Sequence, residues 1–218
     1  MFAYPEIALF DKPVAKTQLF KRTAAAAATK SLFSAQVSEI RWLYKLSQST
    51  INLPPVDGYF EIQVFSLKLK GSELNFKVLE IIDKAVPYPL FYRLQSNGQI
   101  NFVTSYKKPQ QEGEKWLQGG YLQTGWQQQT AIDKQPLPVA LNLKTLYEQM
   151  VLQHVKMPLR HGETIEQLMN RIDEISRNQN ILQRLEAKMH AEKQFNRRVE
   201  LNTQIRQLNK IIEELSAI

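Results

Sequence analysis

Residues 164–218 carry the sequence TIEQLMNRIDEISRNQNILQRLEAKMHAEKQFNRRVELNTQIRQLNKIIEELSAI, which contains neither glycine nor proline. A stretch of this length without either residue favours helix almost throughout. Its second half places five apolar residues three and four positions apart, the spacing of a heptad seam. These residues are Leu201, Ile205, Leu208, Ile212 and Leu215. Such a seam needs cover, so we predict that these side chains bind a partner helix.

The covering helix is either the first half of the same stretch or a second chain. The first half has a similar apolar stripe at Ile165, Leu168, Ile172, Ile175, Leu182 and Met189. Thr164 followed by Gln167 fits a capping box, so the helix should begin there. The stripe ends before residues 190–196, where a turn would make a hairpin. The alternative is an unbroken helix of about 78 Å that pairs with a second chain and forms an oligomer.

Composition restricts the possible classes of protein. The chain has 218 residues, of which 43% are hydrophobic, enough for one domain with a buried core and an appendage. The absence of cysteine excludes disulfides and thiolate metal sites. The three histidines lack ligand spacing, so we expect neither a metal nor a cofactor. With no secretory signal pattern and no apolar run of membrane length, we expect a cytoplasmic protein without membrane contact.

The net charge of +7 lies wholly in the first 160 residues. Within them, residues 12–38 contain no acidic residue. The basic residues of this stretch are Lys12, Lys16, Lys21, Arg22 and Lys30. Such a stretch suits phosphate backbones, and we predict that it binds DNA without sequence preference. The alternative is an ordinary solvated basic surface.

The sequence before the helical stretch alternates between strand and helix patterns. Residues 1–23 contain prolines and little periodicity, which indicates an N-terminal arm. Apolar residues at helical spacing predict a helix at residues 30–46, and strict alternation predicts a strand at 59–69. Asn97-Gly98 indicates a hairpin turn. We further predict helices at residues 73–85 and 142–154, strands at 90–94, 99–106 and 119–126, and a polar loop at 107–115.

These elements predict an α+β fold. Residues 24–156 would form a body with a mixed four- to five-stranded sheet and packed helices. Residues 163–218 would follow as a helical hairpin or a coiled coil.

Few residues suggest catalysis. Glu61 and Gln63 on the predicted strand, with Glu39 and Lys107, can be arranged in the outline of a metal-dependent nuclease, to which Asp83 could add a carboxylate. However, Gln63 stands where such enzymes need a lysine. Alternation on a half-exposed strand explains Glu61 and Gln63 equally well. Convergence of these side chains in one cleft would distinguish a nuclease from a non-catalytic fold.

Several short motifs in order resemble the bacterial domain-of-unknown-function family 4391. They are Trp42-Leu-Tyr-Lys-Leu, Thr50-Ile-Asn-Leu, Glu61-Ile-Gln-Val-Phe, Ile82-Asp-Lys with Pro87 and Pro89, Tyr106-Lys107, and Glu192-Lys-Gln-Phe-Asn-Arg-Arg-Val-Glu-Leu-Asn202. The family has no established activity. The resemblance implies that the gene lies in a restriction-like, phage-defence cluster. The expected partner is then a helicase or a DNA methyltransferase encoded in the same cluster.

The resemblance also marks polar positions that packing does not require: Lys45, Asn52, Glu61, Asp83, Lys84 and Lys107. They either line one site or brace connections between elements. We therefore expect a non-catalytic accessory protein that binds a helicase or methyltransferase. A divergent metal-dependent nuclease and a purely structural adaptor that does not bind DNA are the alternatives.

Overall fold

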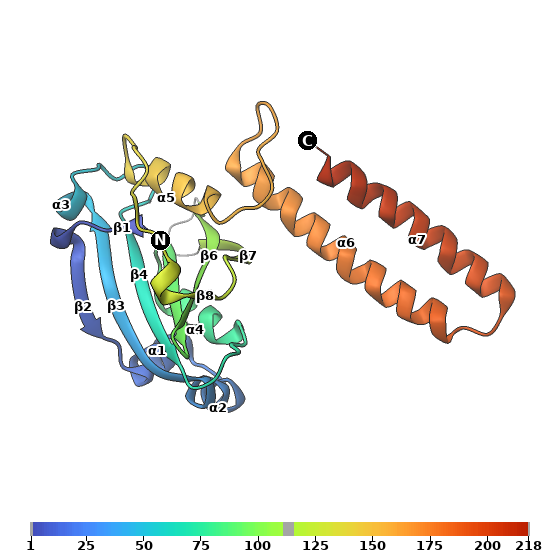
Figure 1. Cartoon of the computed structure of the whole chain (residues 1–218), viewed down its shortest axis with the longest axis horizontal. Helices are drawn as coiled ribbons and strands as arrows, with labels where there is room; N and C mark the ends of the chain where they lie inside the picture. The colour runs from blue at the N-terminus through green and yellow to red at the C-terminus, as the bar shows by residue number, and fades with distance from the viewer. Residues whose placement is uncertain (1, 111–115, 218) are drawn as a thin grey trace. The chain divides into compact units, whose positions relative to one another are not determined.

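The computed structural model describes residues 2–110 and 116–217, and it divides into two compact units. The first, residues 1–155, contains all the described strands and is called the sheet unit here. The second, residues 156–218, contains two long helices and is called the helical unit. Figure 1 shows both.

The sheet unit is built on a mixed sheet of seven described strands. They are β2 (Leu9–Pro13), β3 (Val37–Ser47), β4 (Glu61–Leu69), β5 (Leu90–Ser96), β6 (Gln99–Pro109), β7 (Trp116–Gln123) and β8 (Gln127–Gln128). The order is β2-β3-β4-β5-β6-β7, with β8 also paired to β6. Only the β4–β5 pair is parallel within this described sheet. The mixed α+β class is confirmed, and the prediction of four to five strands was too low.

Helices cover both faces of the sheet. One face packs against α1 (Lys16–Thr23), α2 (Ala27–Gln36) and α4 (Lys77–Ala85), which form a continuous core with alternate residues of β4 and β5. The opposite face receives α5 (Leu143–Leu152), whose Tyr147 ring lies 6.0 Å from that of Phe91. Because Phe91 and Tyr92 are consecutive in β5, they point to opposite faces, and Tyr92 belongs to the α4 side.

The helix predicted at residues 30–46 is wrong beyond Gln36. The helix ends there and the chain continues as β3, paired with β4. The register shifts between Val37 and Glu39 and again between Trp42 and Tyr44. Each β-bulge breaks the alternation of a strand, so the apolar residues acquire spacings of three and four that imitate a helix.

Residues 1–23, predicted to be an irregular arm, are largely ordered into elements. They contain β1 (Phe2–Ala3), a 3-10 turn at Glu6–Ala8, β2 and α1. β1 pairs in parallel with β9 (Gln135–Pro136) in a separate two-stranded sheet. The weak periodicity reflects elements too short to display a pattern.

Other predicted elements of the sheet unit are confirmed with shifted ends. β5 and β6 form the predicted hairpin, with positive φ at both Asn97 and Gly98, as a type I′ turn requires. α4 begins at Lys77 rather than at residue 73, and β7 at Trp116 rather than 119. The short α3 (Gln48–Ile51) was not predicted. Residues 111–115 of the predicted loop lie outside the described residues.

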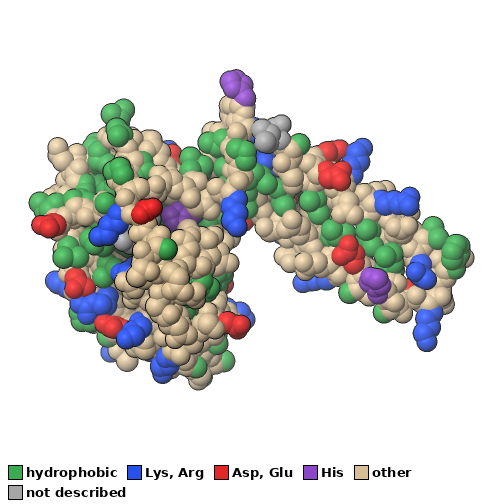
Figure 2. Space-filling model, viewed as in Figure 1, with side chains coloured by type: hydrophobic (Ala, Val, Ile, Leu, Met, Phe, Trp, Pro, Cys, Tyr) green, Lys and Arg blue, Asp and Glu red, His purple; other side chains and the backbone are tan. Residues whose placement is uncertain are grey.

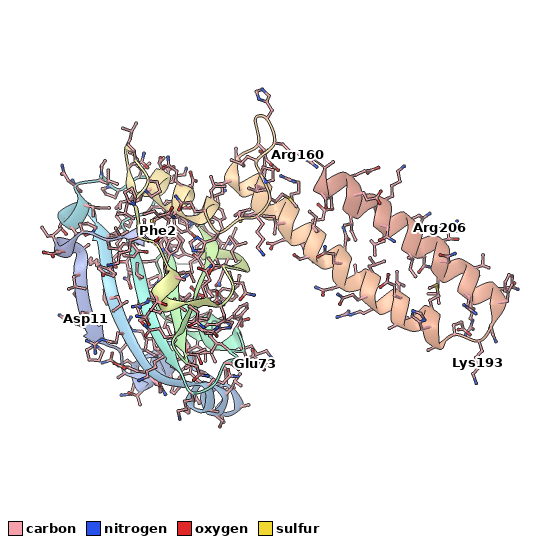
Figure 3. All side chains as sticks on the ribbon, viewed as in Figure 1. Phe2, Asp11, Glu73, Arg160, Lys193 and Arg206 are labelled. Atoms are coloured by element: carbon pink, nitrogen blue, oxygen red, sulfur yellow. The ribbon has the colours of Figure 1, made fainter. Side chains whose placement is uncertain are left out.

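The helical unit contains α6 (Ile165–Ala191) and α7 (Phe195–Ser216), which run side by side (Figure 1). Thr164 and Gln167 form the predicted capping box at the start of α6. The predicted turn at residues 190–196 is also confirmed, and Lys193 marks it in Figure 3. Without a glycine, the Glu192 side chain stabilises this turn by accepting from the backbone amides of Lys193 and Gln194.

Two arginines not singled out from the sequence hold the open end of the hairpin. The buried Arg171 of α6 binds both oxygens of Glu163 at 2.7 and 2.8 Å and donates to the Leu215 carbonyl at 3.0 Å. Arg160 donates to the carbonyls of Glu214, Leu215 and Ala217. These donors satisfy the last carbonyls of α7 and place positive charge at its negative end.

The ion pair with Arg171 predicts a pH-dependent hairpin. The hydrogen bond from Arg171 lowers the pKa of Glu163 from 4.5 to about 2. Stability from this carboxylate is therefore complete above pH 4.5 and is lost as the pH falls toward 2. Glu163→Gln should lower the hydrogen-exchange protection of α7 at pH 7 and flatten its pH dependence between these values. The exposed Glu174→Gln should retain the wild-type profile, and an unchanged profile in Glu163→Gln would contradict this role.

Candidate functional site

Lys107 lies at the centre of the polar cluster within the sheet unit. It is 1% exposed, and its ammonium lies 2.8 Å from Asp83 Oδ1. Nζ also donates to the carbonyls of Tyr88 at 2.9 Å and of Asp83 and Val86 at 3.4 Å. Two of these carbonyls belong to the C-terminal end of α4, where a helix attracts positive charge.

Lys107 faces the α4 side by the alternation of β6, which also places Val103 of the α4-side core on that face, and a β-bulge lies beside it in β7. The register of β6 and β7 shifts between Ser105 and Lys107, leaving the Gly119-Gly120 pair opposite one residue of β6. The Tyr147 hydroxyl of α5 donates to the Ser105 carbonyl at 2.9 Å and accepts from the Lys107 amide at 2.6 Å. Tyr147 thus satisfies backbone groups at the irregular part of β6.

Asp83 is held from its second oxygen as well. Oδ2 accepts from the Tyr121 hydroxyl at 2.5 Å and from Gln118 Nε2 at 3.2 Å, both on β7. Burial, and next the charge of Asp83, raises the pKa of Tyr121 well above its usual value, so the phenol stays protonated and donates. Burial lowers the pKa of Lys107, while Asp83 opposes that shift. The cluster therefore ties α4 to β6 and β7.

A second polar group begins at Glu61, on the first residue of β4. Its carboxylate accepts from the Gln63 amide and pairs with Lys45 Nζ at 2.9 Å. Gln63 shares a sheet face with Phe65 of the α4-side core, because they are two residues apart in β4. The backbone N–H of Gln63 donates to the Pro89 carbonyl, and Lys107 Nζ donates to the adjacent Tyr88 carbonyl. The two groups therefore flank the same segment.

Glu39 does not join either group, although the nuclease alternative would require it to. It lies opposite Lys68 in the sheet and binds Arg41 at 3.3 Å, whereas Glu61 lies opposite Ser47. Glu39 and Ser47 are eight positions apart on β3, which corresponds to roughly 25 Å of strand. The nuclease outline placed Glu39 on a helix, whereas β3 carries it to the far end of the sheet.

The contacts favour a bracing role for the cluster. The ammonium of Lys107 has acceptors for all three of its hydrogens, and its side chain is buried. Within residues 2–110 and 116–217, no three His, Cys, Asp or Glu side chains form a group that could hold a metal ion.

The remaining polar family positions are dispersed. Asn52 ends α3 with φ of 55°, in the left-handed region that asparagine tolerates. The Lys45 carbonyl accepts from Thr50 Oγ1 at 2.8 Å beside the same turn. Lys84 is exposed on α4. Lys45 and Asn52 thus brace the connection from β3 to β4.

The five basic candidates lie on β2, α1 and α2. Lys16 donates to the Val37 carbonyl, and Arg22 donates to the Ala85 carbonyl at 3.4 Å. Lys12 lies over the Phe10 ring and Lys30 over the Phe20 ring, and Lys21 is exposed. In the described part of the chain, none of the five forms an ion pair with a carboxylate.

The apolar seam of α7 packs within its own unit. Ile205 is buried, and the other seam residues are half-buried, consistent with packing against α6. The partner helix predicted for Leu201, Ile205, Leu208, Ile212 and Leu215 is thus supplied by the same chain. A coiled coil with a second chain remains a prediction.

The comparisons identify a family. The family described as "Domain of unknown function (DUF4391)" matches residues 2–212. The chain belongs to this family. A search of the curated proteins found no match for this DUF4391 chain, and a search of the solved structures found none. No helix in the described ranges is both long and apolar enough to cross a membrane.

Sequence reasoning missed Tyr121 and Tyr147, the residues that complete the cluster. Tyr121 lies in the apolar pattern of a strand, and Tyr147 lies in that of a helix. In such a pattern, core packing alone explains a tyrosine, so nothing indicated that its hydroxyl makes a hydrogen bond. The Gly119-Gly120 pair inside a predicted strand was an available signal of a bulge.

The buried pair predicts a large cost for breaking it. Lys107→Met leaves the Asp83 carboxylate buried without its cation and should lower the free energy of unfolding of the sheet unit by about 3–5 kcal/mol. Lys84→Met changes an exposed residue of α4, the helix that carries Asp83. It should alter the free energy of unfolding by less than about 0.5 kcal/mol. Urea unfolding followed by tryptophan fluorescence measures both. Equal midpoints for the two variants would contradict a bracing role.

Proposed function

We propose that this protein is a non-catalytic accessory subunit whose sheet unit contacts the DNA backbone and whose helical unit contacts a protein partner. The resemblance stated above supplies the context, a bacterial restriction-like or phage-defence system with a helicase or DNA methyltransferase. The placement in the cytoplasm belongs to the same proposal.

The observation that carries the DNA contact is the uncompensated charge of the N-terminal elements. Lys12, Lys21 and Lys30 are exposed, and the structure records no carboxylate paired with them in its described part. Burial, and next the nearby Lys70, lowers the pKa of Lys16, which indicates two positive charges in proximity. A phosphate group would relieve this repulsion.

The charge pattern supports weak binding without sequence readout. The face in view in Figure 2 mixes Lys and Arg with Asp and Glu side chains over the sheet unit. Separated cations can neutralise a few phosphates, but they do not make a continuous positive channel. These positions do not indicate a helix or strand that would contact base edges in a groove of DNA. We therefore expect the lysines to contact the phosphates.

The helical unit suits a protein partner through its outer surface, because α6 already covers the predicted seam. Phe195 is 77% exposed at the start of α7, and Val199 is exposed one turn later on the same side. We place the helicase or methyltransferase contact at this end of the hairpin. The alternative is that the same surface binds a second copy of this chain.

The nuclease alternative retains one favourable observation. Glu61 and Gln63 lie on the face that carries Lys107 and beside the same segment. Lys45, paired with Glu61, could provide the missing lysine. Against it, Asp83 and Lys107 already satisfy one another. The adaptor alternative gains support only if DNA binding fails.

DNA binding predicts a steep dependence on salt. The protein should shift duplex DNA of any sequence at about 50 mM salt, and binding should weaken as counterions compete. Changing Lys12, Lys21 and Lys30 together to glutamine should reduce the slope of log K against log salt by about 2–3. Lys16 and Arg22 are left intact because they bind backbone carbonyls of the fold.

The matched control changes three exposed basic residues of the helical unit, Lys188, Lys193 and Arg206, to glutamine. This variant has the same net charge as the first but should bind DNA as the wild type does. Absence of a shift in the wild type would favour the structural adaptor. Equal weakening in both variants would indicate general charge attraction and contradict the proposed surface.

The non-catalytic assignment predicts no metal-dependent cleavage. Purified protein with Mg²⁺ or Mn²⁺ should leave single- and double-stranded DNA intact, because the carboxylates do not converge. Cleavage that disappears in Glu61→Gln, while circular dichroism shows an intact fold, would establish the nuclease alternative instead.

A further inference from the structure

A cavity of about 250 Å³ lies in the sheet unit, away from both the polar cluster and the basic residues. Its floor is the sheet face opposite α4, with Val64 and Phe91 among the floor residues. The N-terminal segment with Phe2 and Tyr4 lines it, and so do Lys134 and Gln135 at β9. The β1–β9 pair therefore joins two segments distant in sequence at its rim. Figure 3 labels Phe2 there.

Aromatic side chains dominate the wall. Phe2, Tyr44, Phe91 and Phe102 all line the cavity, and Tyr4 stacks on Tyr44 with ring centroids 4.5 Å apart. Flat apolar walls of this kind bind planar rings by stacking. The volume is below the range of about 300–1,000 Å³ typical of drug-sized ligands, so the occupant should be small.

One charged side chain in the cavity has a buried nitrogen without a hydrogen-bond partner in the described structure. Arg93 of β5 lines the cavity, and its Nε is buried without a hydrogen-bond partner in the described structure. No lining residue is a carboxylate, and the exposed Lys134 adds a second cation. A guanidinium stays protonated in proteins, so an unpaired one beside a cavity favours an anion with planar or tetrahedral oxygens.

His154 contributes a neutral acceptor. Its Nδ1 lies 3.0 Å from the Met150 carbonyl, which can only accept, so Nδ1 carries the hydrogen. Burial lowers the pKa of His154, which keeps the ring neutral at pH 7 and leaves Nε2 as an acceptor. The ring lies 5.6 Å from that of Phe91 and lines the cavity. It can accept from an exocyclic amino group of a planar ligand.

We propose that this cavity binds a small ligand with one planar aromatic ring system and one anionic group, of the class of nucleoside monophosphates. The ring would stack against the aromatic wall, and the anionic group would bind Arg93 and Lys134. The anionic group would accept a hydrogen bond from the buried Nε of Arg93, which has no other partner in the described structure. This site is independent of the proposed DNA surface, which lies on other residues.

The test uses the full chain and the four ribonucleoside 5′-monophosphates, each compared with its nucleoside and with inorganic phosphate. At ten times the dissociation constant, at least one nucleotide should raise the melting temperature of the sheet unit by about 3–6 °C. The nucleoside or phosphate alone should produce a smaller shift. No shift with any nucleotide, or an equal shift with phosphate alone, overturns the proposal.

Arg93→Met tests the anion contact. It should weaken nucleotide binding at least about 10-fold, because a charge-assisted hydrogen bond is lost. The ligand-free melting temperature should not fall, since the guanidinium has no described partner. Arg41→Met, which removes an arginine paired with Asp11 and Glu39, should keep wild-type binding. If Arg93→Met does not fold, Lys134→Met at an exposed position takes its place, and unchanged nucleotide affinity in the variant used overturns the proposal.

Discussion

The burial of the Lys107 ammonium is the constraint on which the sheet unit depends. A buried cation is costly unless a carboxylate and further acceptors surround it. Asp83 and the carbonyls at the end of α4 provide them, and Tyr121 and Gln118 hold the other oxygen of Asp83. The position of α4 against β6 and β7 therefore follows from the need to satisfy one charge.

The polar positions that the sequence singles out take part in similar pairings. Four of the six polar positions that the family resemblance marks form two ion pairs, Asp83–Lys107 and Lys45–Glu61, while Asn52 ends α3 and Lys84 is exposed. Each pair joins elements that are separate in the chain. The ligands that we propose are therefore assigned to two other regions, the basic N-terminal surface and the aromatic cavity.

Sequence reasoning succeeded where local rules determine the structure. The Thr164 capping box, the Asn97-Gly98 turn and the glycine-free hairpin are local features with direct physical causes. It failed at residues 37–47 because two bulges gave a strand the spacing of a helix. It identified Asp83 and Lys107 but not Tyr147, and it could not predict the Arg93 cavity, because segments distant in the sequence create it only after folding.

A double-mutant cycle between Lys107 and Asp83 tests the central claim most directly. Lys107→Met, Asp83→Leu and the double variant would be compared with the wild type by urea unfolding. The account predicts a coupling free energy of about 2 kcal/mol or more, with the double variant more stable than either single one, because it leaves no unpaired charge buried. Additivity within about 0.5 kcal/mol would contradict the claim that this pair organises the sheet unit.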